Sequence, residues 1–153
     1  MRRLKERTLW HMHILFPITI VTILLSKPLF PIVFNPDFSA SAEIFMIYLL
    51  TINSKMLFPQ TVAIGLGKTK ALLSISLLEL VVHIALSLLF VQFWGIAGVA
   101  WAALVAFWIE KFAICLYLYF RLGIKPSAYT PLKAYALYNA FTVIVFTAAY
   151  FWL

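Results

Sequence analysis

Charged and polar side chains lie inside the long apolar blocks of this sequence, where they could bind a charged cargo or relay protons. Four of them follow one another at steps of three, four and four residues, namely Ser76, Glu79, His83 and Ser87. This spacing places them on one face of a helix. A charge at the middle of a membrane helix costs about 2.5–3.5 kcal/mol on insertion scales, so such residues rarely lack a role.

The charged residues admit two interpretations, and the sequence leaves both open. In the first, Lys55, Glu79 and His83 line a polar cavity that contacts a charged substrate or relays protons. In the second, Lys55 and Glu79 neutralise each other as a packing pair, and His83 bonds to a nearby serine. Removing one partner strands the other charge in either case. The candidates for a substrate or ion pathway are Asn53, Lys55, Gln60, Glu79, His83, Glu110 and Lys111.

Motifs for metal or enzyme chemistry are missing from the sequence. His11 and His13 resemble half of a metal site, but no cluster of carboxylates or cysteines accompanies them. There is no glycine-rich phosphate loop, nucleophile elbow or HExxH motif. Cys115 lies in an apolar block, where a cysteine is usually a packing residue. We therefore expect no metal, no cofactor and no enzymatic activity.

The composition indicates a membrane protein. Of the 153 residues, 65% are hydrophobic and 11% are charged, with a mean hydropathy of +1.02. Soluble domains are nearer 45–50% apolar and about 25% charged. The net charge of +7 comes from cations at the ends of apolar blocks, which is typical of orientation signals. We therefore expect membrane lipid as a partner and no nucleic acid.

The elements that must position the charged residues are helices. Five segments are long enough to cross a hydrocarbon core of about 30 Å, which takes about 20 residues. They are 9–34, 40–65, 71–93, 96–120 and 132–153. The predicted fold is an all-α, polytopic transmembrane bundle of about five helices.

Prolines and small residues shape these helices. Pro17 and Pro59 should kink the first and second, and Pro28, Pro31 and Pro36 predict an irregular end to the first. The segments 71–93 and 96–120 should form a close hairpin. Its packing residues are Gly95, Gly98, Ala102 and Ala106, the last three at steps of four that let another helix approach.

The distribution of cations predicts a cytoplasmic N-terminus. On that side the chain would carry nine, namely Arg2, Arg3, Lys5, Arg7, Lys68, Lys70, Arg121, Lys125 and Lys133. The other side would carry only Lys27, beside Asp37 and Glu43. The positive-inside rule favours this orientation. Five crossings leave the C-terminus outside, which predicts that a sixth helix is missing.

Three motifs, in this order, resemble a known family. They are NPDFSASAEIF at 35–45, the basic turn GLGKTK at 65–70, and GIAGVAWA at 95–102. Over about residues 10–125 the chain resembles the C-terminal half of polysaccharide exporters in the multidrug/oligosaccharidyl-lipid/polysaccharide (MATE-like) superfamily. The resemblance implies that 1–125 is a partial C-terminal transporter lobe of four helices. Residues 126–153 would be an additional helix, truncated before its partner.

The resemblance also implies a function. The protein would be a flippase of the bacterial cytoplasmic membrane that moves a lipid-linked oligosaccharide for lipopolysaccharide, O-antigen or capsule biosynthesis by alternating access. Its partners would be that substrate and a missing N-terminal lobe, and Lys55 would face the lipid diphosphate. A multidrug or cation antiporter of the same superfamily, coupled through Glu79 and His83, is the alternative. We prefer the flippase because cations that could be buried outnumber anions. A small non-transporting scaffold protein is a further alternative.

Overall fold

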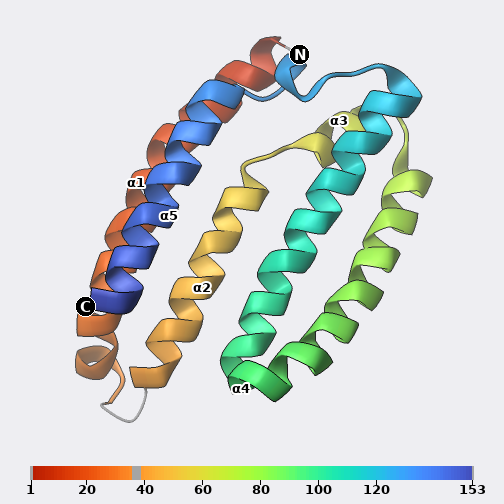
Figure 1. The fold of residues 1–153 in the computed structure, drawn as a ribbon. Helices are drawn as coiled ribbons and strands as arrows, with labels where there is room; N and C mark the ends of the chain where they lie inside the picture. The colour runs from red at the N-terminus through yellow and green to blue at the C-terminus, as the bar shows by residue number, and fades with distance from the viewer. Residues whose placement is uncertain (1, 36–38, 153) are drawn as a thin grey trace.

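The computed structural model describes residues 2–35 and 39–152, which form helices and no strand (Figure 1). The elements are α1 (Arg2–Val33), α2 (Ser39–Lys55), α3 (Pro59–Gly65), α4 (Thr69–Leu122), the short 3₁₀ helix η2 (Pro126–Ala128) and α5 (Leu132–Trp152). The prediction of an all-α fold is confirmed. Leu153, Pro36 and Asp37, which figured in the predicted ends and charge count, lie outside the described residues.

The α4 segment is a hairpin of two antiparallel arms, 69–94 and 96–122, that turn at Gly95 (Figure 1). Gly95 has φ 57° and ψ −142°, a conformation that is open to glycine and strained for other residues. Gly98 packs against the first arm so closely that an added Cβ would overlap the carbonyl of Phe90. Ala102 and Ala106 are fully buried. The predicted close hairpin is confirmed.

The helices form a row in which α2 holds a central place. It packs against α1 and α5 on one side and against α4 on the other. Figure 1 shows α1 and α5 side by side, with the second arm of α4 next to α2 and the first arm at the edge. The first arm exposes many apolar side chains, including Leu73, Leu80 and Leu88. This is the expected pattern for a surface that faces lipid or another helix.

Three helices, α1, α4 and α5, are long and apolar enough to cross a membrane, and the bent pair α2 and α3 is a fourth candidate. Each arm of α4 is about 40 Å long at 1.5 Å per residue. Each arm therefore exceeds a hydrocarbon core of about 30 Å. The described helices are thus compatible with an integral membrane protein.

The helix boundaries correct several predictions. The first helix begins at Arg2 rather than at residue 9, because the basic residues that precede the apolar block are themselves good helix formers. Pro28 and Pro31 lie within α1, which continues to Val33, so they do not end the helix. Pro17 also lies in α1 without breaking it, and a bend there stays a prediction.

The predicted second helix, 40–65, is two helices. α2 ends at Lys55, and α3 begins at Pro59 after a break that bends the pair by 44°. Pro59 occupies the first turn of α3, where its missing N–H costs no hydrogen bond. The predicted kink at Pro59 is therefore a complete break that starts a new helix.

The segments that carry most cations gather at one end of the molecule. Residues 2–7, the 65–70 turn and the 122–132 connection lie together at the top of Figure 1, and the Gly95 turn lies at the bottom. At that other end, Lys27 donates a hydrogen bond to the Tyr150 carbonyl oxygen, 2.8 Å away. The side of the membrane that each end faces stays a prediction.

The connection before α5 is anchored by Tyr129, which is fully buried among apolar residues of α3 and α4. Its hydroxyl lies 3.2 Å from the Cys115 sulfur. Burial, together with this hydrogen bond, raises the pKa of the Tyr129 hydroxyl well above its usual range. Cys115 is thus a packing residue with a hydrogen-bonding partner.

Candidate functional site

Six polar side chains gather where α3 meets the two arms of α4, and we call them the Glu110 cluster. They are Gln60 from α3, Ser76, Glu79 and His83 from the first arm, and Glu110 and Lys111 from the second arm. The hairpin register explains the meeting. Glu79 lies 16 residues before Gly95 and Glu110 lies 15 residues after it, so both are about 23 Å from the turn along their arms.

Glu110 is the centre of the hydrogen bonds in this cluster. Its Oε2 lies 3.2 Å from the Lys111 Nζ and accepts a hydrogen bond of 3.2 Å from the Gln60 Nε2. Its Oε1 accepts a hydrogen bond of 3.0 Å from the Ser76 hydroxyl. The side chains of Glu110 and Lys111 are only 12% and 7% exposed. Charge-assisted hydrogen bonds of this kind stabilise the ionised carboxylate.

Glu79 is half-buried in the same cluster, with its side chain 14% exposed. Its Oε1 has no hydrogen-bond donor among the described residues, and the Nδ1 of His83 lies 3.9 Å from it. Glu110 and Lys111 both act on Glu79 electrostatically. The cluster therefore holds two carboxylates against one ammonium group, and an uncompensated buried charge is costly. A proton or a monovalent cation bound at Glu79 and His83 would neutralise the cluster.

The structure does not join Lys55 to Glu79. Lys55 is the exposed last residue of α2, and its Nζ lies over the Phe107 ring, 5.3 Å from the centroid. Among the described residues, no carboxylate lies within the 4.0 Å that defines an ion pair with Lys55. The Phe107 ring also contacts the His83 ring, at 6.4 Å. The predicted packing pair of Lys55 and Glu79 is therefore wrong. Lys55 is the last residue of α2, and its ammonium group lies over an aromatic ring of the second arm of α4.

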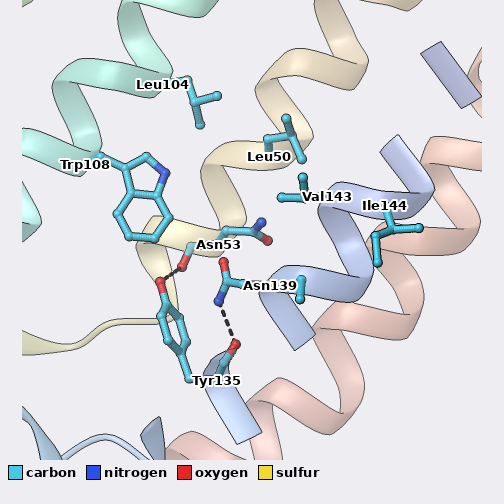
Figure 2. A pocket seen from close by; sticks show the side chains of 9 residues that line it. Leu50, Asn53, Leu104, Trp108, Tyr135, Asn139, Val143 and Ile144 are labelled. Carbon is cyan, nitrogen blue, oxygen red and sulfur yellow. Dashed lines mark hydrogen bonds between the residues drawn. The ribbon is translucent and has the colours of Figure 1, made fainter. Parts of the chain in front are cut away.

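Asn53 belongs to a second polar site, which we call the Asn53 pocket (Figure 2). This pocket of about 510 Å³ lies between α2, the second arm of α4 and α5. Its lining residues are Leu50, Asn53, Leu104, Trp108, Tyr135, Asn139, Ala140, Val143 and Ile144. Tyr135 donates a hydrogen bond of 2.7 Å to the Asn53 carbonyl oxygen, and Asn139 Nδ2 donates one of 2.8 Å to the Tyr135 carbonyl oxygen.

The Asn53 pocket contains two unused hydrogen-bond acceptors. The side-chain Oδ1 atoms of Asn53 and Asn139 are buried and have no donor among the described residues. In Figure 2 the two amide groups face each other near the Trp108 ring. A buried acceptor left without a donor costs about 1–3 kcal/mol, so a ligand with hydroxyl groups would find favourable partners here.

All six residues of the Glu110 cluster stand out in the sequence, but the bonds of Glu110 to Gln60 and Ser76 do not follow from it. In the Asn53 pocket, only Asn53 is a sequence candidate. Asn139 and Tyr135 are not, although Asn139 is an amide inside an apolar segment and could have been noticed. Asn53 and Lys55 lie outside that cluster.

The fold and the two sites define an all-helical chain with several helices long and apolar enough to cross a membrane. No protein-family model, curated protein or solved structure matches this chain.

Proposed function

We propose that the chain is an integral membrane protein and forms part of a flippase for lipid-linked oligosaccharides of cell-surface polysaccharide. The resemblance at 35–45, 65–70 and 95–102 motivates this proposal. Its main structural support is the Asn53 pocket. The bent pair α2 and α3 and the α4 hairpin also fit the broken helices that line transporter cavities.

The Asn53 pocket has the chemistry to hold a saccharide. The two unbonded Oδ1 atoms can accept hydrogen bonds from sugar hydroxyls, and the half-buried indole of Trp108 offers an apolar surface. A mostly apolar pocket with a few placed polar groups is typical of ligand sites. Lys55 is exposed and has no carboxylate partner among the described residues, so it can meet the anionic diphosphate of a lipid carrier.

Cells whose own copy of the gene carries Asn53→Leu and Asn139→Leu test this proposal. Leucine keeps the volume and removes the acceptors, so surface polysaccharide should fall. Lipid-linked oligosaccharide should accumulate on the cytoplasmic leaflet, with an unchanged amount of protein in the membrane. Gln92→Leu is the matched control because Gln92 is an exposed amide of the first arm, next to the turn. Normal export by the Asn53 and Asn139 double variant would reject the saccharide site.

The Glu110 cluster favours a second function, that of a proton- or cation-coupled antiporter. Cations that could be buried do not exceed anions here, because the cluster holds Glu79 and Glu110 against Lys111, and Lys55 is exposed. This arrangement removes the charge argument that favoured the flippase over the antiporter. Efflux driven by an imposed pH gradient in everted vesicles distinguishes them. An antiporter would lose it with Glu79→Gln and keep it with Asn53→Leu and Asn139→Leu.

A further inference from the structure

A separate pocket lies where the start of α1 meets the start of α5, at the end of the molecule rich in cations. It has a volume of about 560 Å³. Its polar lining comes from Lys5 of α1, from Ser127 and Thr130 of the connection before α5, and from Lys133 of α5. Leu9 and Leu132 supply apolar lining. No aspartate or glutamate is among the lining residues.

The pocket is electropositive for two reasons. Lys5 donates a hydrogen bond of 3.2 Å to the Ser127 carbonyl oxygen, which holds its ammonium group at the pocket. Its other N–H groups have no acceptor among the described residues and can bind a ligand. Lys133 adds a second ammonium group. The pocket is also lined by the first turn of α5, a helix of 21 residues. The first N–H groups of a helix have no partner within it and attract anions.

Thr130 gives independent support for a ligand at this position. It is fully buried and lines the pocket, yet its hydroxyl has no hydrogen-bond partner among the described residues. A buried hydroxyl without a partner is unfavourable. An oxyanion in the pocket would accept this hydrogen bond and would also contact both lysines.

We propose that this pocket binds the headgroup phosphate of an anionic phospholipid. The phosphate would meet Lys5, Lys133, the Thr130 hydroxyl and the first turn of α5. The acyl chains would run past Leu9 and along the exposed apolar residues Leu137 and Phe141 of α5. This inference rests on the membrane location and not on the flippase activity, so either can fail without the other.

Lipid retention measures the binding directly. The protein is purified in a neutral detergent, titrated with phosphatidylglycerol or phosphatidylcholine, and analysed by native mass spectrometry. We expect preferential retention of phosphatidylglycerol. Two lysines at a membrane surface contribute about 5-fold each, so Lys5→Gln with Lys133→Gln should weaken binding about 25-fold. Lys68→Gln with Lys70→Gln is the matched control because it removes two exposed lysines near the same end.

Two further measurements distinguish loss of lipid binding from misfolding and a lipid from free phosphate. Lys133→Gln alone changes an exposed side chain, so it should fold normally and weaken binding about 5-fold. Inorganic phosphate at equal concentration should not displace the lipid, and displacement would identify free phosphate as the ligand and overturn the lipid proposal. Equal retention of the two lipids would also overturn it. Binding of phosphatidylglycerol by the Lys5 and Lys133 double variant as tightly as by the control variant would overturn it too.

Discussion

Replacing Lys111 by methionine should destabilise the protein far more than the same replacement at Lys55. Lys111 is 7% exposed and forms an ion pair of 3.2 Å with Glu110 in a cluster that contains a second carboxylate. Methionine keeps the length of the side chain and removes the charge. Glu79 and Glu110, with side chains 14% and 12% exposed, would then lie together without an ammonium group.

The structure gives the size of this effect. Removing one partner of a buried ion pair costs about 3–5 kcal/mol. Lys55 is exposed, and its ammonium group lies over the Phe107 ring, an interaction that is worth about 0.5–1 kcal/mol at an exposed site. For a chain of this size, 1 kcal/mol shifts Tm by about 2–4 °C. We therefore expect a fall of about 6–20 °C for Lys111→Met and about 1–4 °C for Lys55→Met.

Thermal unfolding in detergent, followed by tryptophan fluorescence, measures both variants. The double variant Lys111→Met with Glu110→Gln serves as a further comparison. It should recover more than half of the lost stability because neutral groups replace the pair. Equal losses of Tm for Lys111→Met and Lys55→Met would contradict this expectation, since they would mean that Lys111 is as well solvated as Lys55.

Three further predictions concern other parts of the molecule. Gly98→Ala should lower Tm much more than Gly65→Ala, because a Cβ added at Gly98 overlaps the Phe90 carbonyl whereas a Cβ added at Gly65 has no neighbouring atom within 4 Å. Equal Tm values for the two variants would argue against the close hairpin. Burial raises the pKa of Tyr129, so its contribution to stability is complete below about pH 10 and is lost as the pH rises further. Tyr129→Phe should therefore flatten the fall in Tm above pH 10, and an unchanged slope would contradict this. Glu79→Gln should change the free energy of unfolding, measured by thermal unfolding, by less than about 1 kcal/mol, because the Glu79 Oε1 has no hydrogen-bond partner among the described residues to lose. A larger loss would indicate such a partner.

The helices were predictable from the sequence because their apolar runs are long and carry few charged residues. The residues at which the helices begin and end were harder to predict. Hydropathy locates the apolar stretch, but α1 starts at Arg2 since basic residues continue a helix into the aqueous region. The break after Lys55 depends on how residues 56–58 pack. A proline at position 59 predicts that the helix is disturbed there, but not that it ends and a new helix begins.

Most residues of the candidate sites were predictable from the sequence, Asn139 and Tyr135 excepted, but their hydrogen-bond partners were not. The steps from Ser76 to His83 predict that those side chains share one helix face. They do not indicate which other helix packs against that face. The bonds of Glu110 to Gln60 and Ser76 depend on the hairpin register and on the bend before α3. Opposite charges make a Lys55–Glu79 packing pair one of the two interpretations that the sequence allows, but at the end of α2 Lys55 lies over the Phe107 ring.

Labelling of single cysteines from each side of the membrane tests most directly whether this chain crosses the bilayer with the Glu110 cluster inside it. In a Cys115→Ser background, cysteines replace Lys68, Glu79 and Ile96 one at a time, and intact cells are treated with an impermeant maleimide before and after permeabilisation. We predict that position 96 reacts in intact cells, that position 68 reacts only after permeabilisation, and that position 79 stays unlabelled in both. Labelling of all three positions in intact cells, or of none after permeabilisation, would contradict the account.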